Sequence, residues 1–541
     1  MKKNLFSLIF LLTSILANAQ NFTAMDSLRG GWHEFRSCFD LQHYHLKLKV
    51  DPKTRFISGS NRWTCRGISA SQIIQVDLDA ELNITSIISS SGPATYKRKG
   101  SSVLVDLPFK IQKDSDFWIE IQYNGHPRLA LNPPWDGGFV WSRDQNDKPW
   151  IGVACEGDGA SLWFPSKDHP ADEPDSALLE YEVPDNLIAV GNGRFLGKKK
   201  AGDSSSIYKY GVSYPINHYN ITFNAADYQS WSDTMRLPES RSILPMTFYA
   251  LRQDFQKAKI QWAQSKKIIR VLSESFGDYP FVKDGYKVVQ TPYLGMEHQS
   301  CIAYGDQFQN NFYGFDFILL HETAHEWWGN RTSADDHADL WIHEALATYS
   351  EAVYLEKLGG GKKEAIRYLL DQRKKIKNRT AIAGQRGVYF NEWKDSDMYY
   401  KGSWMFHSMR YAVGNDKIWF KALHDIGNEI GFKPISADTF SAKLSKLLKV
   451  NIQPLVNHYT QFLTWPALEY HNYLEKGKEM FSFKWVSSAE GFDYSAPVVM
   501  DGRTERINPS STGMKFELKL PVMKIEPSEE LYLFKMQYKK R

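Results

Sequence analysis

Apolar residues stand at alternate positions over much of the first half of the chain, for example from Tyr44 to Val50 and from Phe117 to Tyr123. A period of two is typical of strands that bury one face, and Gly, Asn, Pro and Asp residues mark turns between such runs. Residues 20–240 therefore predict an N-terminal β domain, which we expect to be sandwich-like.

The pattern changes near residue 240. Apolar residues recur at helical spacing from 251 to 276, and a short strand-like run at 286–290 precedes Gly295-Met296-Glu297-His298. Helical spacing also fits the segments 316–329, 339–358, 362–377, 402–413 and 417–429. After about residue 480, short strands with turn signals such as Asp501-Gly502 return. We expect a multidomain α+β fold, with a mixed α+β domain at 241–470 and a small C-terminal β domain at 471–541.

The first residues predict a secretory signal peptide. Lys2 and Lys3 precede an apolar run, and Ala17-Asn18-Ala19 is a small-x-small cleavage site, so we assign residues 1–19 to the signal. The run is too short to span a bilayer comfortably, and no later stretch is long and apolar enough to span one. We expect an exported protein, periplasmic or secreted, without a transmembrane anchor.

Composition excludes few classes of protein. Of 541 residues, 42% are hydrophobic and 24% charged, which is an ordinary globular balance. The net charge of +4 is not concentrated in a basic tract, so we expect no nucleic-acid partner. The sequence contains four cysteines, and a disulfide between Cys38 and Cys65 is left open.

The chemistry is indicated by His321-Glu322-x-x-His325, followed by Glu344. Histidines four apart lie on one helix face, so both imidazoles can reach one ion. Two histidines and a carboxylate leave an open position on zinc, as in catalytic sites. Glu322 follows the first histidine, so we expect it beside the metal as a general base for a zinc-bound water. We therefore predict one Zn²⁺ ion, held by His321, His325 and Glu344.

Three motifs in this order resemble the gluzincin aminopeptidases, the family of aminopeptidase N and leukotriene hydrolase. HETAHEWWGN with Glu344 in LWIHEA resembles the zinc signature of that family. Gly295-Met296-Glu297-His298 is similar to its Gly-x-Met-Glu-Asn motif, and Tyr399-Tyr400-Lys401-Gly402 to its Tyr-x-Lys-Gly motif. The resemblance covers roughly residues 40–470. It implies a thermolysin-like central domain and a zinc metallo-aminopeptidase that cleaves the first peptide bond of peptides with a free N-terminus.

The resemblance also implies roles for individual residues. Glu297, beside Gly295 and Met296 in the substrate-binding motif, would bind the α-ammonium of the substrate, and Glu156 would be a second amine anchor. Tyr399 would stabilise the oxyanion as the second catalytic residue beside Glu322. A carboxylate at a fixed distance from the metal admits a charged N-terminus and disfavours an interior peptide, which would leave it unpaired.

The chain also departs from the family pattern. His298 and His343 stand where Asn is usual, Glu326 where Gln is frequent, and Leu294 where Gly is common. The sequence ends about 70 residues after the central domain, so we expect a shorter form without the large helical C-terminal domain of many relatives. Two alternatives stay open: an endopeptidase or epoxide hydrolase with the same metal site, and a peptide-binding protein with a silent zinc site.

Overall fold

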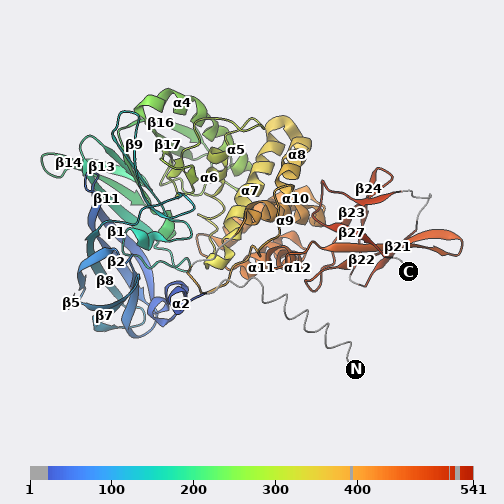
Figure 1. The fold of residues 1–541 in the computed structure, drawn as a ribbon, viewed down its shortest axis with the longest axis horizontal. Helices are drawn as coiled ribbons and strands as arrows, with labels where there is room; N and C mark the ends of the chain where they lie inside the picture. The colour runs from blue at the N-terminus through green and yellow to red at the C-terminus, as the bar shows by residue number, and fades with distance from the viewer. Residues whose placement is uncertain (1–21, 390–393, 511, 518–523, 540–541) are drawn as a thin grey trace.

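The structure, a computed structural model, describes residues 22–389, 394–510, 512–517 and 524–539. The signal peptide expected at 1–19 lies outside these residues and stays a prediction. Within the described ranges, no helix combines the length and the apolarity needed to cross a membrane. Figure 1 shows an elongated molecule in which β-rich regions at both ends flank a helical middle.

The described part of the chain begins with two short helices, where the sequence predicted strands. These are α2 (Ala24–Gly30) and α3 (Glu34–Ser37). The helix α2 starts with a capping box, because the Thr23 hydroxyl accepts from the Asp26 N–H and the Asp26 carboxylate accepts from the Thr23 N–H. This local exchange satisfies two otherwise free N–H groups and competes with strand formation.

The N-terminal β domain contains three sheets. The largest has eight strands in the order β13-β14-β11-β1-β2-β8-β4-β5, beside a four-stranded sheet β12-β15-β10-β9 and a three-stranded sheet β3-β7-β6. The strands are β1 (Phe39–Asp51), β2 (Phe56–Gly67), β3 (Ser71–Asp77), β4 (Leu82–Ser89), β5 (Gly92–Pro93), β6 (Thr95–Lys99), β7 (Ser102–Ile111), β8 (Asp116–Gly125), β9 (Gly138–Arg143), β10 (Pro149–Ala154), β11 (Ser176–Pro184), β12 (Ile188–Gly191), β13 (Arg194–Lys200), β14 (Ser205–Val212) and β15 (Phe223–Ala226).

Alternation along these strands matches their burial. The apolar side chains of β1 and β8 lie in one core, and the polar residues between them are more exposed. All four cysteines, Cys38, Cys65, Cys155 and Cys301, are buried free thiols, so the structure contains no disulfide between Cys38 and Cys65.

The central domain is a five-stranded sheet covered by helices, and the mixed α+β class expected from the sequence is confirmed. The sheet order is β16-β17-β18-β20-β19. Its strands are β16 (Tyr228–Arg236), β17 (Ile243–Leu251), β18 (Tyr286–Gln290), β19 (Gly295–Met296) and β20 (Ile302–Tyr304). The first of these, β16, lies before the boundary expected near residue 240. It still belongs to the central domain, because it pairs with β17 rather than with the N-terminal sheets. The edge strand β19 runs antiparallel to β20.

The helices of this domain up to residue 430 lie in the expected segments with shifted ends, and two further helices follow them. They are α4 (Phe255–Gln261), α5 (Ser265–Phe276), α6 (Phe317–Ala324), α7 (Trp341–Leu355), α8 (Gly361–Arg373), α9 (Asp397–Val413), α10 (Asp416–Ile430), α11 (Ala437–Leu448) and α12 (Gln453–Gln461). The helix α6 ends earlier than predicted, and α9 starts earlier, so that Tyr399 lies inside a helix rather than before one.

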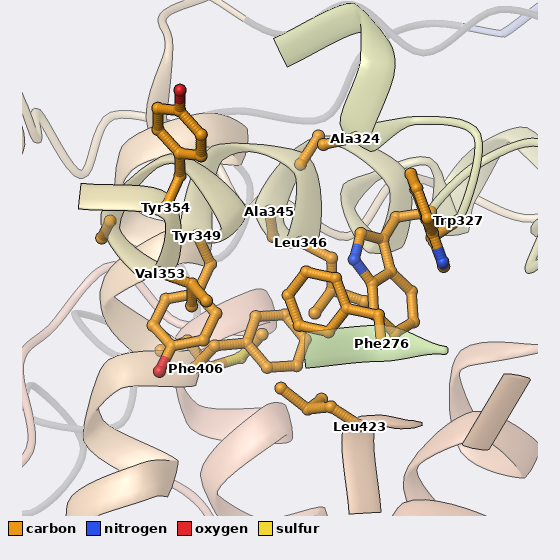
Figure 2. Packing of buried hydrophobic residues seen from close by; sticks show 14 of the residues in the cluster. Phe276, Ala324, Trp327, Ala345, Leu346, Tyr349, Val353, Tyr354, Phe406 and Leu423 are labelled. Atoms are coloured by element: carbon orange, nitrogen blue, oxygen red, sulfur yellow. The ribbon is translucent and has the colours of Figure 1, made fainter. Parts of the chain in front are cut away.

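Helix α7 is the centre of the apolar core, and every one of its residues is buried. Side chains from α5, α6, α9 and α10 pack around it in one cluster. Figure 2 shows this packing, with Phe276, Ala324, Trp327, Ala345, Leu346, Tyr349, Val353, Tyr354, Phe406 and Leu423 labelled. A helix buried on all sides cannot shift without opening cavities, so the polar side chains that it carries are held in fixed positions.

The described residues after 466 form strands, as predicted. They are β21 (Ala467–Glu475), β22 (Lys478–Val486), β23 (Ala496–Met500), β24 (Arg503–Ile507), β25 (Met514–Glu517), β26 (Ile525–Pro527) and β27 (Lys535–Tyr538). Asp501 and Gly502 join β23 to β24, and both have positive φ, as expected for a tight hairpin turn.

Candidate metal centre and active site

Two buried helices bring the three predicted ligands together. His321 lies in α6, His325 caps its C-terminal end, and Glu344 lies in the first turn of α7. Asp316 is the N-cap of α6, and its carboxylate accepts from the Leu319 N–H (3.0 Å) and fixes the first turn. The apolar residues after this cap anchor the helix in the core.

The ligand atoms converge on one point. His321 Nε2 lies 3.2 Å from His325 Nε2 and 3.2 Å from Glu344 Oε2, and His325 Nε2 lies 3.5 Å from Glu344 Oε2. Zinc bonds of about 2.0–2.1 Å in a tetrahedral site place ligand atoms roughly 3.3 Å apart. The spacing of the three donors therefore fits one zinc ion.

Opposite charges hold this donor set together. Burial alone lowers the pKa of His321, but Glu344 and Glu351 hold it well above its ordinary value. Burial also opposes a charged His325, yet Glu344 and Glu297 raise the pKa of its imidazole to about 9. Burial raises the pKa of Glu344, but His325 and His321 outweigh it and keep this pKa well below its ordinary range.

A second layer of hydrogen bonds orients both imidazoles. His321 Nδ1 donates to Glu351 Oε1 (2.8 Å), and His325 Nδ1 donates to the Trp328 carbonyl (2.9 Å). Because these partners only accept, the proton of the neutral, metal-binding form of each imidazole lies on Nδ1, and Nε2 then has the lone pair for the metal. Glu351 is itself held by the Tyr368 hydroxyl and by Gln372 Nε2 (3.3 Å). Glu351 was not predicted from the sequence, although it stands seven residues after Glu344, on the same face of α7.

Replacing Glu351 with Gln is expected to weaken zinc affinity by about 10- to 100-fold, because the amide is a weaker acceptor for His321 Nδ1. Competition of the purified protein with a zinc chelator of known affinity measures this. Glu364→Gln, at a partly exposed acid on α8 that pairs with Arg367, is the matched control and should bind zinc normally. Equal affinities in the two variants would contradict the role of Glu351.

Glu322 lies beside the donor set of His321, His325 and Glu344. It is 6% exposed. One of its carboxylate oxygens lies within 4.8 Å of a Glu297 carboxylate oxygen and of a ring nitrogen of His325. Burial raises the pKa of Glu322 to about 8, although the two imidazoles oppose this. A Cβ on Gly295 would lie 2.4 Å from Glu322 Oε1, so glycine is needed there for β19 to pass the carboxylate closely.

A cluster of carboxylates forms the other side of the site. Glu297 follows β19 and is 2% exposed, and Glu156 lies in a loop of the N-terminal domain. Oxygen atoms of Glu156, Glu297 and Glu344 lie within 4.8 Å of one another. Burial raises the pKa of Glu297, and burial with the neighbouring carboxylates raises that of Glu156 well above its ordinary value. Such a concentration of acidic groups favours a cationic ligand.

Tyr219 contributes to this cluster and was not found from the sequence. Its hydroxyl donates to Glu297 Oε1 (2.9 Å), and its ring is 5% exposed. It lies in a short 3-10 helix, His218–Asn220, of the N-terminal domain. Nothing in the local sequence distinguishes it from other buried tyrosines, because the contact joins residues far apart in the chain.

One cavity contains all nine predicted site residues. It has a volume of about 190 Å³, and its wall combines the ligands, Glu322 and the acidic cluster with apolar and aromatic side chains. The lining residues are Pro134, Trp135, Glu156, Leu294, Gly295, Met296, Glu297, Phe317, Ile318, His321, Glu322, His325, Glu344, Ser396, Tyr399 and Tyr400.

The two adjacent tyrosines of α9 differ in their surroundings. The Tyr399 ring centroid lies 6.1 Å from that of His321, whereas the Tyr400 hydroxyl accepts from Lys375 Nζ (3.3 Å). Burial raises the pKa of Tyr399 well above its ordinary value, so its hydroxyl keeps the proton that a hydrogen-bond donor needs. Gly402 lets α9 approach α7, because a Cβ there would lie 2.4 Å from Ala345 Cβ.

Three of the four positions that depart from the family pattern, His298, Glu326 and His343, are buried, and Leu294 is half-buried. His343 Nε2 accepts from the Ala334 N–H (2.8 Å), so its ring turns away from the ligands. Glu326 accepts from the Ser300 N–H (2.8 Å), and burial raises its pKa to about 8, which makes it a neutral neighbour much like glutamine. His298 is fully buried, and burial lowers its pKa to about 3. Among these positions, Leu294 alone lines the cavity.

Comparison with known proteins agrees with this geometry. The chain is 20% identical to leukotriene A-4 hydrolase of Xenopus laevis over 537 residues, which cover 91% of this chain and 84% of that protein. It is 23% identical to leucine aminopeptidase 2 of Lodderomyces elongisporus over 360 residues, 61% of this chain and about half (51%) of that protein. A mutant of the M1 zinc metallopeptidase of Deinococcus radiodurans, solved with a Tyr-Ser-Ala substrate, superposes with a TM-score of 0.67 at 20% identity and covers 79% of this chain and 95% of that one.

The match to a family description lies where the site was found. Residues 263–459 match the peptidase family M1 domain, and this range contains the zinc ligands, Glu322, Glu297 and Tyr399. The chain therefore contains a peptidase family M1 domain and, with a donor set that fits one zinc ion, is a zinc-dependent peptidase.

Proposed function

We propose that this peptidase is an aminopeptidase that removes the first residue of peptides with a free N-terminus. The observation that carries the proposal is the position of Glu156 and Glu297. A carboxylate oxygen of each lies within 4.8 Å of the other and of an oxygen of the metal ligand Glu344. A substrate α-ammonium bound between these two acids has its first carbonyl at the metal and its chain directed away from the acidic cluster. An interior peptide bond would leave both acids buried without a cation, which costs free energy.

Different residues of the cavity have different roles in the reaction. When zinc is held by His321, His325 and Glu344, it acts as a Lewis acid that polarises the scissile carbonyl and makes water a stronger acid. Glu322 takes the proton of the attacking water at its carboxylate and later gives a proton to the leaving amine. Tyr399 donates its hydroxyl hydrogen to the carbonyl oxygen as negative charge develops there.

The relatives support the same chemistry. The leucine aminopeptidases carry an exopeptidase name, and the Deinococcus enzyme was captured with a three-residue peptide. In such a peptide the N-terminal amine and the first carbonyl are close neighbours, so both can lie in one cavity that places acids beside the metal ligands.

Replacing Glu297 with Ala tests this proposal. Cleavage of free-amine aminoacyl amides should fall roughly 100-fold in kcat/KM, because a buried charge pair with the substrate ammonium is lost. Bound zinc should stay at the wild-type level. The Tyr219→Phe variant, which removes one hydrogen bond to Glu297 and keeps the acid, is the matched control and should lose far less.

N-acetylated amides complete the test. The wild-type protein should cleave them poorly, since they carry no ammonium for Glu156 and Glu297. Equal rates on acetylated and free substrates would contradict the proposal and favour an endopeptidase, and an unchanged rate in Glu297→Ala on free amines would remove the assigned role of Glu297.

A further inference from the structure

An exposed aromatic side chain lies at the mouth of the catalytic cavity. Trp135 is 62% exposed, yet it lines the cavity together with Pro134. It belongs to the loop between β8 and β9, on which Leu131 is exposed but does not line the cavity. Exposed single leucines are ordinary, but a large indole ring beside a reaction centre offers apolar area that a ligand can cover.

This loop is not loosely attached. Asp136, next to Trp135, accepts from the Leu131 N–H (2.6 Å) and pairs with Arg128, so the loop is closed on itself. Its ends are also joined to β9, because the Phe139 N–H donates to the Arg128 carbonyl (2.8 Å) and the Ala130 N–H to the Phe139 carbonyl (3.1 Å). The lip formed by Pro134 and Trp135 therefore has a defined position.

The same hydrogen bonds connect the lip to the amine anchor Glu156. Arg128 also donates to Asp158 Oδ1 (3.2 Å), and the Gly137 N–H donates to Asp158 Oδ2 (2.7 Å). Asp158 and Glu156 share one turn, which the Gly159 N–H closes on the Cys155 carbonyl (2.7 Å). Arg128 and Asp158 thus hold Trp135 at a fixed separation from the acid assigned to the substrate ammonium.

The remaining cavity wall complements the lip. Leu294 and Met296 on the β19 side and Phe317 and Ile318 on α6 are apolar, whereas the charged groups gather around the ligands. In an amino acid the side chain leaves the carbon that bears the amine. A wall fastened to the amine anchor therefore meets the first side chain of the peptide before any other.

Resting on the proposed aminopeptidase function, we propose that Trp135 determines specificity by covering a large apolar side chain on the N-terminal residue of the substrate. Arg128 and Asp158 are positioning residues that keep this lip at a fixed distance from Glu156. The preferred substrates are peptides that begin with a bulky apolar or aromatic residue.

The test compares free-amine fluorogenic amides of Phe, Leu and Ala. In Trp135→Ala, kcat/KM for the Phe and Leu amides should fall about 10-fold, mainly through KM, because apolar contact area is lost for large side chains. The Ala amide should change by less than about 2-fold, since a methyl group reaches little of the ring. Trp135→Phe should retain most of the preference, and Leu131→Ala, on the same loop but off the cavity, should leave the Phe-to-Ala ratio unchanged. An unchanged ratio in Trp135→Ala, or an equal loss in Leu131→Ala, would overturn the inference.

The positioning residues have their own readout. Arg128→Ala should raise KM for every free-amine substrate and also lower the Phe-to-Ala ratio, whereas Arg128→Lys should recover part of both. A general loss of stability would lower activity without changing the ratio, and that result would remove the positioning role.

A binding measurement separates this inference from the proposed function. If the wild-type protein cleaves none of the free-amine amides, the aminopeptidase proposal fails, and the lip is then tested in Glu322→Gln by calorimetric titration with Phe-Ser-Ala and Ala-Ser-Ala. Adding Trp135→Ala should weaken binding of the first peptide about 10-fold more than that of the second. Equal weakening, or no difference between the two peptides in the parent variant, would overturn the specificity role.

Discussion

Replacing Glu322 with Gln is expected to lower kcat on free-amine amides by on the order of 1000-fold, within the range attributed to a positioned general base. The amide has nearly the size of the acid, so it fits the narrow space beside Gly295. It cannot take a proton at the working pH. Because Glu322 is not among the converging ligand atoms, bound zinc should stay at one ion per chain.

A matched control is available on the same stretch of chain. Glu326 is a buried acid one turn further on, with a pKa raised by burial to about 8, and it does not line the cavity. Glu326→Gln should keep activity within about 3-fold, because a neutral acid and an amide differ little at a site that binds no substrate. Activity of Glu322→Gln within 10-fold of wild type would show that another group accepts the proton.

The same pair of variants decides between enzyme and binding protein. A binding protein with a silent zinc site would hold zinc without hydrolysing peptides, and Glu322→Gln would then change no rate. Turnover in the wild-type protein that disappears in Glu322→Gln and persists in Glu326→Gln excludes that alternative.

The parts of this protein that sequence predicts well are those set by local geometry. His321 and His325 lie four apart in a helix, so their convergence follows from helical pitch once the apolar lead-in is recognised. Alternation from Tyr44 to Val50 gives the buried face of β1 for a similar reason, because successive strand residues point to opposite faces. These signals depend on a few neighbouring residues and on no distant partner.

The parts that sequence did not give depend on contacts between distant segments. Tyr219 reaches Glu297 across a domain boundary, and Trp135 lines the cavity through a loop of the N-terminal domain. The residues of β16 do not indicate which sheet it joins, and its pairing is with β17 of the central sheet. By contrast, two features that were not predicted do have local signals: Glu351 stands seven residues after Glu344, and the capping box at Thr23 has a Thr-x-x-Asp pattern.

Removing zinc with a chelator is expected to abolish hydrolysis and to lower the Tm, and adding zinc back should restore both. Without the Lewis acid neither the carbonyl nor the attacking water is activated, so the residual rate should fall below detection. The stability change follows from mass action: zinc at about 1,000 times its Kd stabilises the folded state by about 4 kcal/mol. Metal analysis by mass spectrometry, activity assays and thermal unfolding of the same samples measure the three quantities together.

The structure indicates that the zinc-free fold should survive this treatment. His321 and His325 remain paired with Glu344, and His321 also with Glu351, so loss of the ion leaves a compensated cluster rather than isolated buried charges. Glu322→Gln is the control, because its Tm should fall on chelation as much as that of the wild type although it has no activity to lose. A chelated sample shown to be free of metal but still active would contradict a catalytic metal. A Tm that drops in wild type but not in Glu322→Gln would mean that Glu322 is itself a ligand, which would return the choice of base to the remaining acids of the cavity.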